Sequence, residues 1–146
     1  MYRELVETYI QHNEYARCGR PCDAASIEKA EDCVGYPFPE DLKELLSELD
    51  GDRFLLMSVK QIIEHAKQNR EILAGFFEDK AEFEEKVDRH IFFATNGCGD
   101  YYGYRVLPDG QTDASAIYIW EHETCEHRIV AKNIVDLIRK YYTDKI

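Results

Sequence analysis

Several cysteine and histidine side chains lie close enough together to suggest metal chemistry. His122, Cys125 and His127 fall within six residues, and imidazole and thiolate groups are good ligands for zinc. Zinc sites usually combine two separate couples of closely spaced ligands. A second couple could come only from Cys18 and Cys22, if the fold brought them across. We therefore interpret the first segment as a polar loop between two strands, and we expect no metal and no cofactor.

Cys98 lies in a glycine-rich turn, Asn96–Asp100, whose composition could support nucleophilic catalysis. A cysteine thiolate beside an imidazole can act as a nucleophile, and His122 or His90 would be its partner. Nothing in the spacing requires this pairing, so a small hydrolase or metal protein dependent on cysteine and histidine stands as an alternative function. The glycines could also let a ligand approach the backbone, but a tight hairpin turn is the simpler interpretation.

The charge distribution limits the classes of partner. The chain has 18 lysines and arginines against 29 aspartates and glutamates, a formal net charge of −11. This balance argues against nucleic acid and against an anionic membrane surface, because both attract basic proteins. Ten acidic residues and two lysines lie between Asp23 and Asp52. These acids are either solvated helix faces that keep the protein soluble or a surface for a basic protein partner.

Apolar spacing and capping residues predict helices in the first half of the chain. A helix of about twelve residues begins near Tyr2. A second follows Asp23, a good N-cap, and ends at Gly35, where a left-handed C-cap is expected. Pro39 is expected as the first residue of a third helix, and Ser58 as the cap of a fourth. The inner face of this fourth helix is predicted to carry Val59, Ile62, Ile63, Ala66 and Leu73.

The second half is rich in aromatic and β-branched residues, which favour strands. The predicted strands are 90–95, 101–106, 116–120 and 128–131, with a short earlier one at 54–57. A short helix is expected around 80–87, and Asn133 can cap a final helix. Strands joined by short turns indicate an α+β fold, with an antiparallel meander of about four to six strands packed against N-terminal helices and a C-terminal helix. We expect a single domain, residues 1–146.

The second of the main strands suggests that one sheet face is exposed. By alternation, Tyr102, Tyr104 and Val106 share one face, and Tyr101 and Arg105 share the other. If helices cover only one side of the sheet, an aromatic face remains exposed and could recognise a partner.

The longest apolar run is five residues, Ala116–Trp120, which is too short to cross a membrane. The N-terminus has no apolar signal region. We therefore expect a cytoplasmic protein with mostly free thiols, present as a monomer or weak dimer.

Three motifs occur in a recognisable order. The first is Val34-Gly-Tyr-Pro-Phe-Pro followed by a leucine-striped helix that ends in Asp50-Gly51. The second is Gly97-Cys-Gly-Asp-Tyr-Tyr, and the third is Ile117-Tyr-Ile-Trp-Glu-His. Together, over roughly residues 24–142, they resemble the SUKH superfamily, and specifically its Smi–Knr branch. Cys98 inside the glycine turn and the charged segment 74–88 depart from the family pattern.

The resemblance implies an α+β domain that binds proteins and is not an enzyme. Bacterial members are typically immunity proteins that neutralise a toxin, often a nuclease, whereas the fungal member is a regulator of cell-wall synthesis. We therefore expect a non-catalytic immunity protein against a basic toxin, with a regulatory scaffold domain as the alternative. The residues expected to contact the partner are Glu40, Asp41, Glu44, Glu48, Asp50, Asp52, Asp100, Tyr101, Trp120 and His122.

Overall fold

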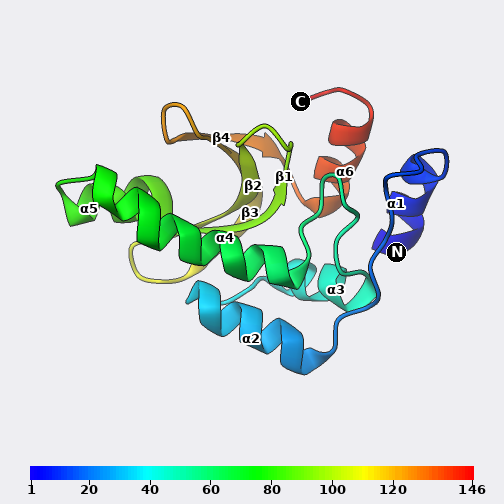
Figure 1. The fold of residues 1–146 in the computed structure, drawn as a ribbon, viewed down its shortest axis with the longest axis horizontal. Coiled ribbons are helices and arrows are strands. Elements are labelled where there is room, and N and C mark those ends of the chain that lie inside the picture. The colour runs from blue at the N-terminus through cyan, green and yellow to red at the C-terminus, as the bar shows by residue number, and fades with distance from the viewer.

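A computed structural model describes residues 1–146 (Figure 1). Four strands form one antiparallel sheet in the order β1-β2-β3-β4, with helices before and after it. The α+β meander expected from the sequence is confirmed. The helices are α1 (Tyr2–Ile10), α2 (Ala24–Val34), α3 (Glu40–Glu48), α4 (Val59–Ile72), α5 (Lys80–Phe83) and α6 (Ile134–Tyr142), with a 3-10 turn η1 (Leu73–Phe76) and a π-helical turn η2 (Glu84–Asp88). The strands are β1 (His90–Thr95), β2 (Tyr101–Val106), β3 (Thr112–Glu121) and β4 (Glu126–Ala131).

Helix caps form at the positions that the sequence predicts. The Asp23 carboxylate accepts a hydrogen bond from the backbone N–H of Ser26 at 2.8 Å and so begins α2. Ser58 and Gln61 exchange side-chain-to-backbone hydrogen bonds in a capping box at the start of α4. Gly35 ends α2 with a φ of +90°, a left-handed conformation that glycine adopts without steric cost. These local bonds fix where α2 and α4 begin and where α2 ends.

Several predicted boundaries differ from the structure. Two strands are longer than predicted: β3 covers Thr112–Glu121 rather than 116–120, and β4 begins at Glu126 rather than at 128. Helix α1 has nine residues rather than about twelve, because the chain turns after Ile10, whose carbonyl accepts from the N–H of Asn13 at 2.9 Å. Pro39 is the extended N-cap of α3, so the helix begins one residue later, at Glu40. The helix expected around 80–87 is divided into α5 and the wider turn η2.

The predicted strand at 54–57 is wrong as a strand. Only one isolated bridge forms there, between Leu56 and Ala94 of β1. The Asp52 carboxylate accepts hydrogen bonds from the backbone N–H groups of Phe54 and Leu56, at 2.9 and 2.8 Å. This local network curls the segment, so it touches the edge of β1 without extending along it.

The inner face of the sheet carries the main hydrophobic core. Tyr102 and Tyr104 of β2 are buried there, as their alternation predicts. Figure 1 shows α4 crossing in front of the sheet, with α2 beside it and α1, α3 and α6 gathered at the other end. Apolar side chains that the helices contribute to this core include Val6, Ile27, Leu42, Leu45, Leu46, Ile62, Ile134 and Leu137. No helix combines the length and apolar character needed to cross a bilayer.

The outer face is not left as an open aromatic surface, so that expectation is wrong. Phe92 and Trp120 lie on this face and form a second small core with Val87 of η2. The segment from the end of α4 through η2 therefore folds back over part of the sheet. Only the part nearer β4 is open, where Ile129 is 61% exposed.

The inner face of α4 also differs from its prediction. Ile62 is buried there, but Val59, Ile63 and Ala66 are only half-buried. The other buried side chains of α4 are polar, His65 and Asn69. His65 stacks on the ring of Tyr101, with 3.6 Å between the centroids, so α4 contacts the sheet partly through aromatic packing.

Candidate partner-binding surface

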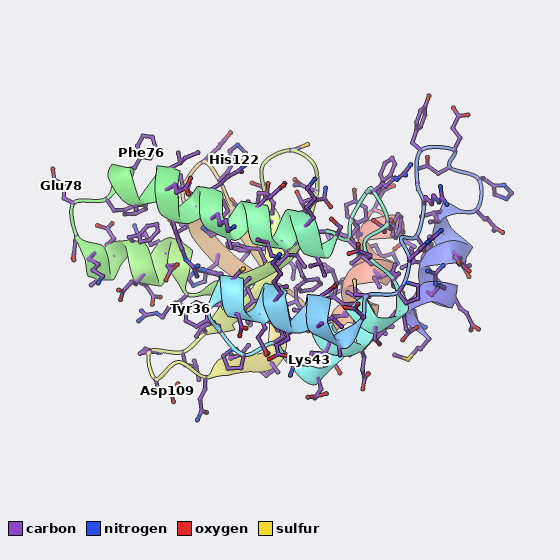
Figure 2. The ribbon with its side chains drawn as sticks, turned by 60° about the horizontal axis from the view of Figure 1, so that its bottom comes forward. Tyr36, Lys43, Phe76, Glu78, Asp109 and His122 are labelled. Atoms are coloured by element: carbon purple, nitrogen blue, oxygen red, sulfur yellow. The ribbon has the colours of Figure 1, made fainter.

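An acidic groove runs between α2 and α3. It has a volume of about 550 Å³. Four acidic side chains line it together with Lys43: Glu28, Glu31, Asp32 and Glu44. Figure 2 shows Lys43 where α2 and α3 lie side by side. The groove therefore gathers carboxylates from two helices into one concave surface.

The turn between α2 and α3 holds this groove in shape. A Glu31 carboxylate oxygen accepts a hydrogen bond from the backbone N–H of Phe38 at 2.7 Å. The same oxygen lies 3.5 Å from the Lys43 ammonium nitrogen. Glu31 and Lys43 thus largely neutralise each other, and Glu28, Asp32 and Glu44 remain as the unpaired negative charges of the groove.

The predicted acids of α3 have different surroundings. Glu40, Asp41 and Glu44 are exposed and free to contact a partner. Glu48 instead accepts a hydrogen bond at 2.7 Å from the N-terminal ammonium of Met1, which ties α1 to α3. Three acids of the groove were not among the predicted contact residues, namely Glu28, Glu31 and Asp32. The signal was present in the sequence, since their spacing of three and four residues places them on one side of a helix.

Asp50 and Asp52 both make structural hydrogen bonds, but only Asp52 is withdrawn from the surface. Asp52 is completely buried and accepts a hydrogen bond from the hydroxyl of Tyr142 at 2.5 Å. Asp50 is half-buried and accepts from the backbone N–H of Val59 at 2.7 Å, at the start of α4. Asp52 in particular cannot reach a partner in this conformation.

Asp100 and His122 lie together at one end of the sheet. One Asp100 oxygen accepts from both the backbone N–H and the Nδ1 of His122, and the other accepts from the Asn96 amide at 3.2 Å. Partial burial raises the pKa of Asp100, but these hydrogen bonds outweigh it and hold the pKa below its ordinary value. Gly99 has a φ of +98°, and a Cβ there would meet the His122 ring at 3.0 Å. The turn therefore packs directly against the ring of His122, and position 99 has no room for a side chain.

The two predicted aromatic contacts are mostly enclosed. Trp120 is 3% exposed and donates its indole N–H to the carbonyl of Lys86 at 2.8 Å. Tyr101 is half-buried against His65. Trp120 is consequently a core residue of the outer face, and only Tyr101 keeps some accessible surface.

The cysteine and histidine candidates do not assemble into a set of metal ligands. No group of three or more His, Cys, Asp and Glu side chains has an arrangement suited to a metal ion. His122 is paired with Asp100, and Cys98 is exposed in the turn. Burial raises the pKa of the Cys125 thiol, and also that of Cys18, so neither is an activated nucleophile.

Comparison with known protein families agrees with this architecture. Residues 21–140 match the SMI1 / KNR4 family (SUKH-1). The chain belongs to this family. The match spans the SUKH-1 domain from the segment before α2 to within α6 and includes the acidic groove and the sheet. SUKH-1 domains are in general toxin-immunity or regulatory domains without catalytic activity. No curated protein matches the chain.

Proposed function

We propose that this SUKH-1 domain is a non-catalytic, cytoplasmic immunity protein that binds and neutralises a basic protein toxin. The acidic groove between α2 and α3 is the observation that supports this function. It combines exposed carboxylates with a concave shape, and protein partners of opposite charge can dock there.

The electrostatics favour fast capture of such a partner. Complementary charge raises association rates, and the effect weakens as salt screens it. A toxin that cleaves nucleic acid needs a basic surface for phosphate contacts, and an acidic groove can occupy that surface. Ala24 adds exposed apolar area to the groove, which strengthens a complex once it forms.

The experiment is co-expression with the product of a neighbouring toxin-like gene. The proposal expects that the pair co-purifies and that the domain restores growth. A double charge reversal, Glu28→Lys with Asp32→Lys, should slow association by about tenfold at low salt. The matched control is Glu78→Lys with Glu123→Lys, which makes the same change of net charge at exposed sites away from the groove.

Two results would contradict the proposal. One is a toxin that neither co-purifies nor is neutralised. The other is an equal loss of association rate in the groove variant and in the control, because the effect would then come from net charge alone. A housekeeping protein recovered in place of a toxin would favour the regulatory function of the same family.

A further inference from the structure

The outer face of the sheet holds a group of charged and imidazole side chains that the acidic groove does not include. His90 of β1 pairs with Arg105 of β2, and His127 of β4 pairs with Trp120 of β3. Paired residues of neighbouring strands share a face. Gly103 lies at the centre of this face and has no side chain, so the rings of His90 and His127 approach to 5.4 Å between centroids.

Two guanidinium groups meet one carboxylate at the border of this face. Arg105 donates to one oxygen of Glu85 at 2.5 Å, and Arg89 donates to the other at 2.8 Å. The side chains of Arg89 and Arg105 are 20% and 24% exposed, whereas that of Glu85 is 45% exposed. The nearby Asp113 carboxylate is engaged by Ser115. Glu85 thus neutralises only one of the two positive charges.

Buried nitrogen atoms without partners are concentrated in the same place. The chain has five buried side-chain polar atoms that make no hydrogen bond, and four of them belong to this group: Nε of Arg89, Nε of Arg105, Nε2 of His90 and Nδ1 of His127. A buried polar group without a partner destabilises the fold. The Nε–H groups of Arg89 and Arg105 are donors, whereas Nε2 of His90 is an acceptor, because the Nδ1–H of that ring donates to the carbonyl of Val87 at 3.0 Å. Two unpartnered arginine donors beside a half-exposed carboxylate indicate a place arranged for an anionic ligand.

We propose that Arg89, Arg105 and His127 form a binding site for a carboxylate group, and that Glu85 fills this site in the free protein. Glu85 itself shows that the two guanidinium groups are spaced to receive the two oxygens of one carboxylate. Tyr118 packs 5.8 Å beneath the Arg105 guanidinium, and its cross-strand neighbour Ile129 is exposed. A carboxylate carried on an apolar stem, such as an acidic side chain or a C-terminus, fits this combination.

The test uses acetate as the probe and the Glu85→Gln variant of the full chain. Arginine Nε–H resonances are followed by NMR, and the dispersed amide spectrum shows that the variant is folded. Acetate should shift the Nε–H resonances of Arg89 and Arg105 to saturation in the millimolar range. In the wild type the same shift should need about fivefold more acetate, since an exposed ion pair contributes up to about 1 kcal/mol.

A matched variant distinguishes a specific carboxylate site from a general effect of positive charge. Glu85→Gln with Arg105→Lys keeps the charge but removes the unpartnered Nε–H, and it should abolish the saturating shift at Arg89. An unchanged shift in that variant would overturn the proposal, as would the absence of saturation in Glu85→Gln. Phosphate and chloride are titrated in parallel. A response to phosphate but not to acetate, or an equal response to chloride, would also overturn a carboxylate site.

Discussion

One oxygen of Asp100 accepts two hydrogen bonds from His122, from the backbone N–H at 3.0 Å and from Nδ1 at 2.7 Å. The two residues lie 22 positions apart in the chain. Asp100 is the last residue of the turn between β1 and β2, and His122 follows β3. The pair therefore connects the β1–β2 turn to the end of β3. This contact accounts for the polar residues beside the glycine turn.

Replacing Asp100 by alanine should destabilise the fold by about 1–3 kcal/mol, because the carboxylate that accepts three hydrogen bonds, two from His122 and one from Asn96, is lost. Urea unfolding measures the change. Glu123→Ala, at an exposed position in the following turn, is the control and should remain within about 0.5 kcal/mol of the wild type. Equal stability of the two variants would show that the pair does not hold the turn.

The buried contact between Asp52 and Tyr142 should be more costly to remove. Asp52 caps the curled segment 54–57 and accepts the Tyr142 hydroxyl. Asp52→Ala leaves two backbone N–H groups and a hydroxyl without their partner, so we expect a loss of about 3 kcal/mol or more. Tyr142→Phe should cost about 1 kcal/mol. A double-mutant cycle with no coupling between the two changes would contradict this account.

Acid should destabilise the protein through two buried histidines. Burial lowers the pKa of His65 and of His90 to about 4. At neutral pH both are uncharged in the folded and unfolded states. Below about pH 6.5 the unfolded chain binds protons that the folded chain does not, so the free energy of unfolding falls by about 1.4 kcal/mol per pH unit for each histidine, down to about pH 4.

The measurement is urea unfolding of the wild type and of His65→Gln between about pH 7 and pH 5. The variant should be less stable at pH 7 but should lose less stability on acidification. His12→Gln, at an exposed site, should keep the wild-type slope. A His65→Gln profile parallel to that of the wild type would show that His65 does not titrate in this way.

Gly103→Ala should be among the most damaging single substitutions in the sheet. A Cβ at this position would collide with the backbone carbonyl of Ile91 on β1, and backbone atoms cannot move away without breaking the strand pairing. We expect a loss of more than about 4 kcal/mol, or failure to fold. Gly75→Ala is the matched control, because nothing lies within 4 Å of its added carbon. Circular dichroism and thermal unfolding compare the two variants.

Local chemistry made much of the fold predictable. Asp23, Gly35 and Ser58 mark helix ends through hydrogen bonds to backbone groups within a few residues. The bounds of β1 and β2 follow from runs of aromatic and β-branched residues between turns. The family motifs are equally local, and the family match confirms the resemblance that they indicate.

The candidate site was only partly predictable for the same reason. The sequence shows that acids are dense between Asp23 and Asp52, but it does not show which of them share a surface. Glu28 and Asp32 line the same groove as Glu44 because α2 and α3 pack side by side. Asp52, in contrast, is buried, where it accepts a hydrogen bond from Tyr142, 90 positions away.

The sequence by itself determined most of the elements, their order and the sign of the charge, because these depend on neighbouring residues and on composition. Only the tertiary structure decided which side chains are covered. Trp120 is buried because η2 folds back to receive its indole N–H at Lys86, and His65 faces inward because the ring of Tyr101 lies against it. Such contacts join residues far apart in the chain, and no local spacing records them.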